Sequence, residues 1–225
     1  MDSGEQKQPS WRIKFQLGWS MVTADATFAD KSGLHPNVLL LTICPSLLKR
    51  IASPILPYLP ETIQSIAKAI WPGLFLPSQV ILKKLKPDWD EEFDHEKTTY
   101  EALDTLQGDV LPQLFGEAQF EGTRALILSY VAGVSCDKVT HFEVEDFQQM
   151  LEQAFLPLQR LGYVHDDPRL DNYLLVEDRK IVVLDLEHLC EDDMDTVDFT
   201  AGTILEMLML WYKRHKEAVE TGNIR

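Results

Sequence analysis

The residues best suited to chemistry lie close together between positions 163 and 187. His165, Asp167 and Asn172 follow one another at intervals of two and five residues, and Asp185 comes after the next two apolar stretches. Carboxylate and amide oxygens are the hard ligands that Mg²⁺ prefers, and a loop carboxylate can also accept or orient the proton of a hydroxyl. Phosphoryl transfer needs charge neutralisation and an aligned nucleophile from a protein. These residue types therefore favour phosphoryl-transfer chemistry.

Each of the neighbouring polar residues also has a structural interpretation. His165 can brace the loop by hydrogen bonding instead of transferring a proton. Asp166 and Asp171 can be loop-capping or solvated carboxylates, and Glu187 and His188 can cap a turn or extend a metal shell. The pair His165-Asp166 can also be taken as the metal dyad of a phosphohydrolase. Such sites need further histidine ligands, and the other histidines of this chain are scattered.

The elements around these residues follow from the apolar pattern. The apolar runs Tyr173 to Val176 and Ile181 to Leu184 are separated by a short charged stretch, which predicts a hairpin. Apolar residues at helical spacing from Phe147 predict a helix that Gly162 terminates. A final helix is expected from near Asp198 to about Tyr212. The loop residues should therefore lie between a helix and a hairpin.

The upstream chain predicts a mixture of strands and helices. Trp11 to Leu17, Val80 to Leu82 and Ala125 to Val131 are expected strands, and Phe93 to Leu106 is an expected helix. The region between Pro45 and Pro77 is apolar at largely helical spacing, but several prolines divide it into short pieces. The sequence therefore predicts an α+β protein.

The loop resembles the catalytic loop of the protein-kinase-like superfamily, in which His, Asp and Asn recur at the same two intervals. The resemblance implies that Asp167 and Arg169 are catalytic, with Asp167 receiving the hydroxyl proton and Arg169 facing the transferred phosphate. It also implies that Asn172 and Asp185 hold Mg²⁺. Leu186-Glu187 follows Asp185 where protein kinases usually carry Phe-Gly.

The same resemblance extends upstream to the residues that would bind ATP. Lys83 ends a Val-Ile-Leu-Lys pattern and would hold the nucleotide phosphates, with Lys84 as a rival and Glu96 as the ion-pair partner. The stretch that contains Ser129 and Val131 resembles the hinge strand, whose backbone would hydrogen-bond adenine. ATP and Mg²⁺ are the cofactors that the resemblance implies.

The implied fold is a bilobal protein-kinase-like fold with a small antiparallel-sheet N-lobe and a shortened helical C-lobe. Residues 1–36 would form an N-terminal strand and polar segment, and 37–77 an apolar helical insertion. The N-lobe core and hinge would occupy 78–133, and the shortened C-lobe 134–225. The last assignment rests on the end of the sequence at Arg225, one helix after Asp185.

The chain departs from regulated protein kinases in ways that leave two functions open. A Gly-x-Gly-x-x-Gly loop before Lys83 and an Ala-Pro-Glu after Asp185 are missing, and the glycine at Leu17-Gly18-Trp19-Ser20 is at best a remnant of the former. The pattern is most similar to short fungal kinase-like proteins and small-molecule phosphotransferases. The first hypothesis is an ATP- and Mg²⁺-dependent phosphotransferase acting on a hydroxyl. The alternative is a catalytically inactive, pseudokinase-like binding or scaffold module.

Composition limits the partners. Basic minus acidic residues gives 21 − 36 = −15, which argues against nucleic-acid binding. The three cysteines show no paired spacing, so neither a disulfide framework nor a cysteine zinc site is supported, and the polar N-terminus does not resemble a signal peptide. We therefore expect a cytoplasmic protein. Basic residues beside the apolar face of 45–77 raise contact with a membrane surface as an option, although packing within the protein would explain the same pattern.

Overall fold

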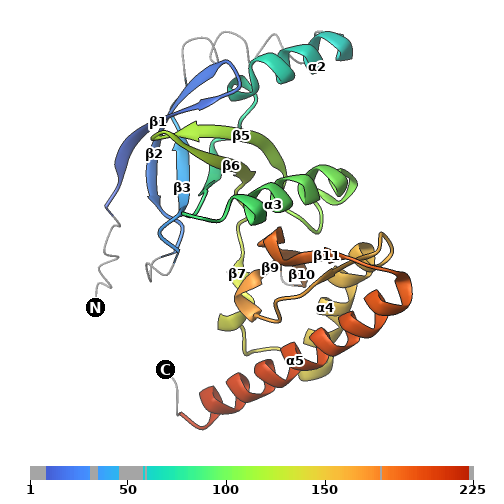
Figure 1. Cartoon of the computed structure of the whole chain (residues 1–225). Coiled ribbons are helices and arrows are strands. Elements are labelled where there is room, and N and C mark those ends of the chain that lie inside the picture. The colour runs from blue at the N-terminus through green and yellow to red at the C-terminus, as the bar shows by residue number, and fades with distance from the viewer. Residues whose placement is uncertain (1–8, 31–34, 46–57, 59, 178, 223–225) are drawn as a thin grey trace, which may run out of the picture. The chain divides into compact units, whose positions relative to one another are not determined.

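The structure is a computed structural model that describes residues 9–30, 35–45, 58, 60–177 and 179–222 (Figure 1). The chain divides into two compact units. Unit 1 consists of Met1–Asp90 with Gln113–Tyr130, and unit 2 of Glu91–Pro112 with Val131–Arg225. Each unit therefore contains segments that are far apart in the sequence.

Unit 1 is a closed, six-stranded antiparallel barrel. The strands are β1 (Trp11–Leu17), β2 (Ser20–Phe28), β3 (Val38–Ile43), β4 (Gln79–Lys84), β5 (Leu114–Phe120) and β6 (Thr123–Ser129). Their order around the barrel is β1-β2-β3-β4-β6-β5, and β5 closes it by pairing with the end of β1. The α+β class and the antiparallel sheet are thus confirmed, whereas closure into a barrel was not expected.

The barrel interior is filled by alternate side chains of its strands. Ile13, Phe15 and Leu17 of β1 are buried while the residues between them are exposed. In β4, Val80 and Leu82 are buried in the same core. Because side chains alternate across a strand, Lys83 lies on the outer face of β4.

Two barrel strands fall in segments for which the sequence predicted something else. β2 lies in the segment 18–36, expected to be polar and turn-rich, and its interior positions Ala24 and Ala26 are too small to give a strong apolar signal. β3 lies at the start of the segment 37–77, expected to be helical. In the remainder of that segment, α2 (Glu61–Ile70) and a 3₁₀ turn (Pro72–Leu74) are helical, and 46–57 and 59 lie outside the described residues.

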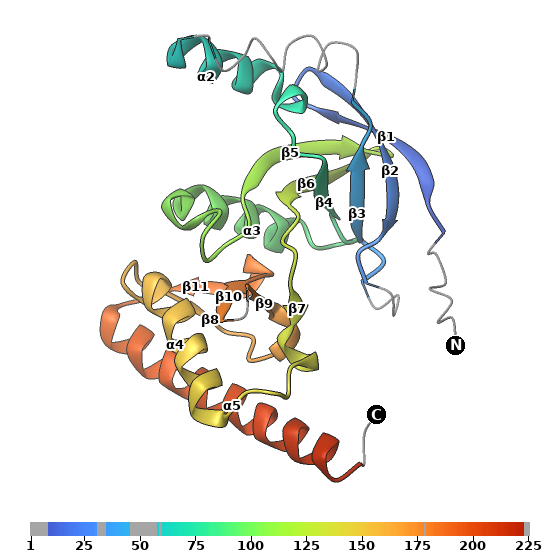
Figure 2. The same ribbon diagram turned by 180° about the vertical axis from the view of Figure 1, so that it is seen from behind.

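Unit 2 combines helices with two small sheets (Figure 2). The helices are α3 (Asp90–Ala102), which starts at the unit boundary, α4 (Val144–Gln159) and α5 (Met194–Glu220). One sheet has the order β10-β9-β7 and the other pairs β11 with β8. The strands are β7 (Val134–Ser135), β8 (Tyr163–His165), β9 (Tyr173–Val176), β10 (Lys180–Val183) and β11 (Leu189–Glu191). Short 3₁₀ turns lie at Asp104–Leu106, Cys136–Lys138, Leu170–Asn172 and Leu186–His188.

Packing between α4 and α5 forms part of the core of unit 2. The rings of Phe147 and Tyr212 stack with their centroids 4.0 Å apart, and the Tyr212 hydroxyl donates to the carbonyl of Phe142 at 2.9 Å. Helix α5 begins four residues before the expected start because Asp193 caps it, accepting from the backbone N–H of Thr196 at 3.1 Å. Among the described residues, no helix combines the length and apolar character that crossing a membrane would require.

Gly133 illustrates how closely β9 approaches the segment before β7. A Cβ atom at Gly133 would lie 2.8 Å from the carbonyl oxygen of Leu175, which is a backbone atom. We expect Gly133→Ala to lower the free energy of unfolding by about 1–3 kcal/mol, because the sheet must shift to relieve the clash. Urea denaturation measures the effect.

Gly202, in the exposed middle of α5, provides the matched control. A Cβ atom there would meet open space. We expect Gly202→Ala to raise the free energy of unfolding by about 0.5–1 kcal/mol, because alanine loses less backbone entropy in a helix. Equal effects of the two variants would contradict the close approach at Gly133.

Candidate active site

Backbone hydrogen bonds, within the loop and to the turn at His188, hold the loop between β8 and β9. The N–H of Asp166 donates to the carbonyl of His188 at 2.8 Å, and the N–H of Arg169 donates to the carbonyl of Asp167 at 2.8 Å. The N–H of Asn172 donates to the carbonyl of Arg169 at 3.1 Å and so begins the turn into β9. These bonds fix the backbone from which the predicted site residues project.

Asn172 orients the carboxylate of Asp167. Its Nδ2 donates to Oδ2 of Asp167 at 2.9 Å and more weakly to the Asp167 carbonyl at 3.4 Å. Asn172 is 7% exposed, so solvent competes little for these bonds. The amide nitrogen faces Asp167, which leaves Oδ1, the metal-binding atom of an amide, as the remaining ligand atom of Asn172.

His165 is a structural histidine in the described loop. Its Nδ1 accepts from the backbone N–H of Asp167 at 3.2 Å, and its Nε2 lies 3.2 Å from the carbonyl of Leu184. This pattern requires the neutral tautomer with the proton on Nε2. Burial lowers the pKa of His165, which favours the same neutral form. The ring therefore ties the loop at Asp167 to the segment that leads to Asp185.

The buried state of His165 predicts a pH-dependent stability. Because its folded-state pKa lies below the value of about 6.5 in unfolded chains, the unfolded state takes up a proton first as the pH falls. We expect the free energy of unfolding to decrease below about pH 6.5, with a slope of at most about 1.4 kcal/mol per pH unit from this group. Urea denaturation between about pH 5.5 and 7.5 measures it, above the range in which ordinary carboxylates titrate.

The comparison of His165→Gln with His141→Gln isolates the group responsible. His141→Gln is the matched control, because it makes the same substitution at an exposed position. His165→Gln should flatten the pH dependence, since the titrating ring is gone. An unchanged slope in His165→Gln would show that His165 is not the group that couples stability to pH.

Asp185 is joined to the same loop through the backbone. The N–H of Leu184 donates to the carbonyl of Asn172 at 2.8 Å, next to the pairing of β9 with β10. Asp185 itself adopts the left-handed conformation with φ 59°, which aspartate tolerates better than most residues. The side chain of Asn172 therefore bonds to Asp167, and its backbone carbonyl bonds to Leu184, the residue before Asp185.

Three carboxylates of unit 2 come together around Asp185. One carboxylate oxygen each from Glu96, Asp185 and Glu187 lies within 4.8 Å of the others. Glu96 is almost fully buried. The same group affects Tyr100, one turn further along α3, whose pKa is raised by burial first and then by the charges of Glu96 and Asp185. Ionised carboxylates this close repel one another. Binding of a cation or a proton relieves the repulsion.

The Arg169 side chain is paired with its neighbour Asp171. Its Nε and one terminal nitrogen donate to the two carboxylate oxygens of Asp171 at 3.0 and 2.7 Å. The pair is bidentate, and the Arg169 side chain is largely exposed. In this arrangement Asp171 orients the guanidinium of Arg169. To contact a phosphate, Arg169 would have to leave Asp171 or keep this pair and donate to the phosphate with its other N–H groups.

In unit 1, the two candidate lysines of β4 have different surroundings. Lys84 Nζ lies 3.2 Å from the Glu121 carboxylate and 5.4 Å from the centre of the Phe120 ring. Lys84 thus has partners in unit 1. By strand alternation, its side chain lies on the same face of β4 as Val80 and Leu82. By strand alternation, Lys83 lies on the opposite face of β4 from Lys84.

The predicted hinge residues Ser129 and Val131 fall on two sides of the unit boundary. The chain passes from unit 1 to unit 2 between Tyr130 and Val131. The N–H of Ser129 donates to the carbonyl of Gln113 at 2.8 Å, and the Ser129 hydroxyl accepts from the Gln113 N–H at 2.8 Å. Because the N–H of Ser129 is engaged, the backbone of Ser129 could offer adenine only its carbonyl.

The turn at Gly18 is not placed to cover phosphates near Lys83. Gly18 and Trp19 connect β1 to β2, and a Cβ atom at Gly18 would meet the Pro72 ring at 3.1 Å. In the barrel order, β1 is separated from β4 by β2 and β3. The hairpin directly before β4 is β2–β3, whose connection spans 29–37, and 31–34 lie outside the described residues.

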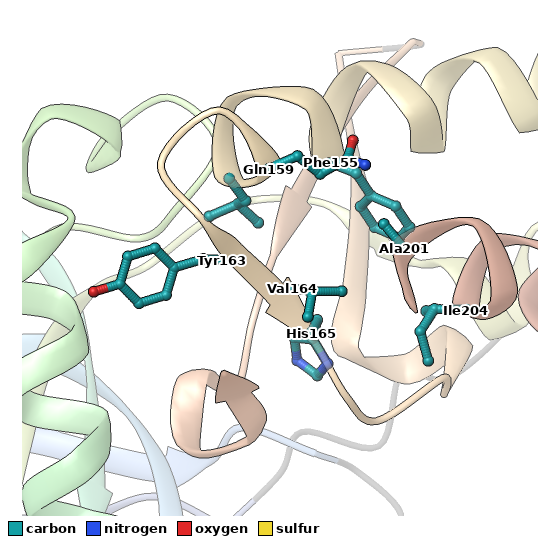
Figure 3. Close-up of a pocket in the computed structure, with 8 residues that line it drawn as sticks. Phe155, Gln159, Tyr163, Val164, His165, Ala201 and Ile204 are labelled. Atoms are coloured by element: carbon teal, nitrogen blue, oxygen red, sulfur yellow. The ribbon is translucent and has the colours of Figure 1, made fainter. Parts of the chain in front are cut away.

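A small, mostly apolar pocket lies beside the loop, between α4, β8 and α5 of unit 2 (Figure 3). Of the loop residues discussed above, His165 is the one that lines it. The remaining lining residues are Phe155, Leu158, Gln159, Tyr163, Val164, Ala201 and Ile204. The pocket therefore belongs to the packing behind the loop and does not contain the carboxylates.

No family model and no curated protein matches the chain. Among solved structures, the chain is similar to the crystal structure of a mutant form of the PknI kinase domain from Mycobacterium tuberculosis, with 16% sequence identity and a TM-score of 0.46. The similarity covers 61% of this chain and 66% of that chain, so the chain spans just under two thirds of the length of that kinase domain. A functional proposal therefore depends on the residues of this chain.

Proposed function

We propose that the protein is a kinase-like phosphotransferase that uses ATP and Mg²⁺ to phosphorylate a hydroxyl group. The observation that carries the proposal is the double role of Asn172. Its amide holds the Asp167 carboxylate at 2.9 Å, and its carbonyl accepts the N–H of Leu184, directly before Asp185. These two bonds support the proposal, because they connect Asp167, Asn172 and the backbone before Asp185 without any ligand, and electrostatic catalysis requires groups that are positioned in advance.

The donor set around Asp185 fits Mg²⁺. The Asp185 carboxylate and Oδ1 of Asn172 are hard oxygen ligands, and the carboxylates of Glu96 and Glu187 lie within reach of Asp185. A cation would also relieve the repulsion among these carboxylates. When bound, Mg²⁺ would neutralise charge on the nucleotide phosphates. We assign Asn172 and Asp185 as its ligands.

The proposed step needs little covalent chemistry from the protein. The hydroxyl oxygen of the acceptor forms a bond to the γ-phosphorus of ATP, the bond from that phosphorus to the β,γ-bridging oxygen breaks, and ADP leaves. Asp167 accepts the hydroxyl proton, and the hydrogen bond from Asn172 keeps its carboxylate aimed. His165 keeps the loop in place and is not an acid or base in this proposal.

The other residues act on the nucleotide and on the transferred group. In the proposal, Lys83 contacts the phosphates and Glu96 pairs with it, while the backbone at Ser129 and Val131 binds adenine. Arg169 faces the transferred phosphate once its pairing with Asp171 opens. The outer-face position of Lys83 supports its role, whereas the engaged N–H of Ser129 makes Val131 the stronger candidate for the adenine contact.

The acceptor that we propose is a small molecule. Between Asp185 and the start of α5 at Met194 there are eight residues, Leu186–Asp193, and three of them form β11, which pairs with β8. A segment this short, and largely paired, leaves little chain for docking a peptide substrate. A hydroxyl-bearing metabolite needs no such platform.

A non-catalytic, pseudokinase-like module is the second candidate. The observation that favours it is the packing of the Gly18 turn against Pro72, which leaves the first hairpin without a flexible glycine loop. ATP consumption against a panel of hydroxyl-bearing metabolites and peptides separates the two. Acceptor-dependent production of ADP supports the enzyme, and Mg²⁺-dependent nucleotide binding without turnover across the panel supports the non-catalytic module.

A further inference from the structure

Helix α3 contacts both ends of the turn that carries Asp185. At one end, one carboxylate oxygen of Glu96 lies within 4.8 Å of an oxygen of Asp185 and of Glu187. At the other end, Nε2 of His95 lies 2.7 Å from the carbonyl oxygen of Leu189, the first residue of β11. All of these residues belong to unit 2. Two adjacent residues of one helix therefore reach the start and the end of the same turn.

The bond between His95 and Leu189 lies on the edge of β11 that does not pair with β8. The carbonyl of His188 accepts from the N–H of Asp166 on the β8 side, so the next carbonyl, that of Leu189, points away from β8. A carbonyl oxygen is only an acceptor, so Nε2 of His95 carries a proton and donates it to this bond. The side chain of His95 thus connects α3 to the backbone of β11.

The position of this bond matters because of the charges beside it. Glu96 lies on α3, whereas Asp185 and Glu187 lie on the turn, and their carboxylates repel one another until a cation binds. This repulsion favours a shift of the turn away from α3. The bond from His95 to Leu189 joins the same two elements and opposes that shift.

We infer, on the basis of the proposed function, that His95 is a positioning residue for the Mg²⁺ site. It holds the turn against α3 through the Leu189 carbonyl, so that the carboxylate of Asp185 stays near those of Glu96 and Glu187 before Mg²⁺ binds. Ligands that neighbouring groups already orient lose less conformational freedom when they bind a metal. His95 itself contacts neither the metal nor the nucleotide.

Calorimetric titration of the full chain with ATP, with and without Mg²⁺, tests the inference. We expect His95→Ala to weaken the binding of Mg²⁺-ATP about three- to tenfold, the scale for losing one hydrogen bond. Binding of ATP without Mg²⁺ should stay at the wild-type level, because the variant keeps every residue that contacts the nucleotide in the proposal. His95→Gln should restore most of the affinity, since the glutamine amide also offers an N–H donor. His95 is exposed, so both variants should fold.

Hydrogen exchange without nucleotide or metal shows whether the bond holds the turn. The backbone N–H groups of residues 186–191 should exchange faster in His95→Ala than in the wild type, and at close to the wild-type rate in His95→Gln. Because this measurement needs no ligand, it separates failure of the inference from failure of the proposed function.

Thr98→Ala is the matched control on the same helix. Thr98 is exposed, and its hydroxyl donates to the carbonyls of Asp94 and His95 within α3. The variant removes a polar side chain from α3 but keeps the bond from His95 to Leu189. Its affinity for Mg²⁺-ATP and its exchange rates at 186–191 should match those of the wild type.

Three results would overturn the inference. One is wild-type affinity for Mg²⁺-ATP in His95→Ala, and another is unchanged exchange at 186–191 in that variant. The third is a His95→Gln variant that binds Mg²⁺-ATP as weakly as His95→Ala, which would show that the N–H donor is not what matters. A wild type whose ATP binding does not depend on Mg²⁺ would overturn the proposed function and this inference together.

Discussion

Asp185→Asn is expected to abolish Mg²⁺-dependent binding of ATP while the protein stays folded. The change removes a hard anionic ligand and keeps the volume of the side chain. Asparagine also tolerates the left-handed conformation that Asp185 adopts at φ 59°, so the turn after β10 should not be strained. Calorimetric titration with ATP in the presence of Mg²⁺ measures the affinity, and urea denaturation checks the fold.

The control for this prediction is Asp195→Asn. Asp195 is an exposed carboxylate in the first turn of α5, so the same loss of charge occurs away from the site. Its affinity for Mg²⁺-ATP should equal that of the wild type. Wild-type affinity in a folded Asp185→Asn variant would show that Asp185 is not a metal ligand.

Asp167→Asn is expected to leave ATP affinity nearly unchanged and to lower turnover by roughly 100-fold or more, a typical effect of losing a positioned proton acceptor. The loop should stay intact, because the side-chain oxygen of asparagine can accept the bond that Asn172 now donates to Asp167. The measurement is ADP production with an acceptor that the wild type phosphorylates, together with a nucleotide titration of both proteins.

The neighbouring residue offers a close control. Asp166 is exposed and its backbone N–H, which a side-chain change retains, pairs with His188. Asp166→Asn should therefore keep wild-type turnover. If Asp167→Asn matches an active wild type, Asp167 is not the proton acceptor and the proposed mechanism is wrong.

Local patterns predicted the elements that carry strong local signals. The strand Trp11–Leu17 has the predicted bounds, because alternating Ile13, Phe15 and Leu17 mark one buried face. The hairpin of β9 and β10 lies within one residue of the prediction, since two apolar runs flank a short charged stretch. The hydrogen bond between Asn172 and Asp167 joins residues five positions apart in the sequence.

Features that depend on distant segments could not be predicted in this way. Strand β5 is interrupted by a bulge near Gly116, and its role in closing the barrel depends on pairing with β1, about 100 residues earlier in the chain. The meeting of Glu96 with Asp185 joins a helix to a turn 89 residues later, since 185 − 96 = 89. The periodicity of apolar residues within one segment does not predict such a contact. The start of α5 depends on the capping of Thr196 by Asp193. The spacing of apolar residues alone does not reveal this cap.

A calorimetric titration of the wild-type protein with ATP, with and without Mg²⁺, tests the central claim most directly. We expect binding that strengthens markedly when Mg²⁺ is present, because the carboxylates around Asp185 repel the phosphates until a cation lies between them. The absence of ATP binding under both conditions, or binding that Mg²⁺ does not strengthen, would contradict the proposed phosphotransferase.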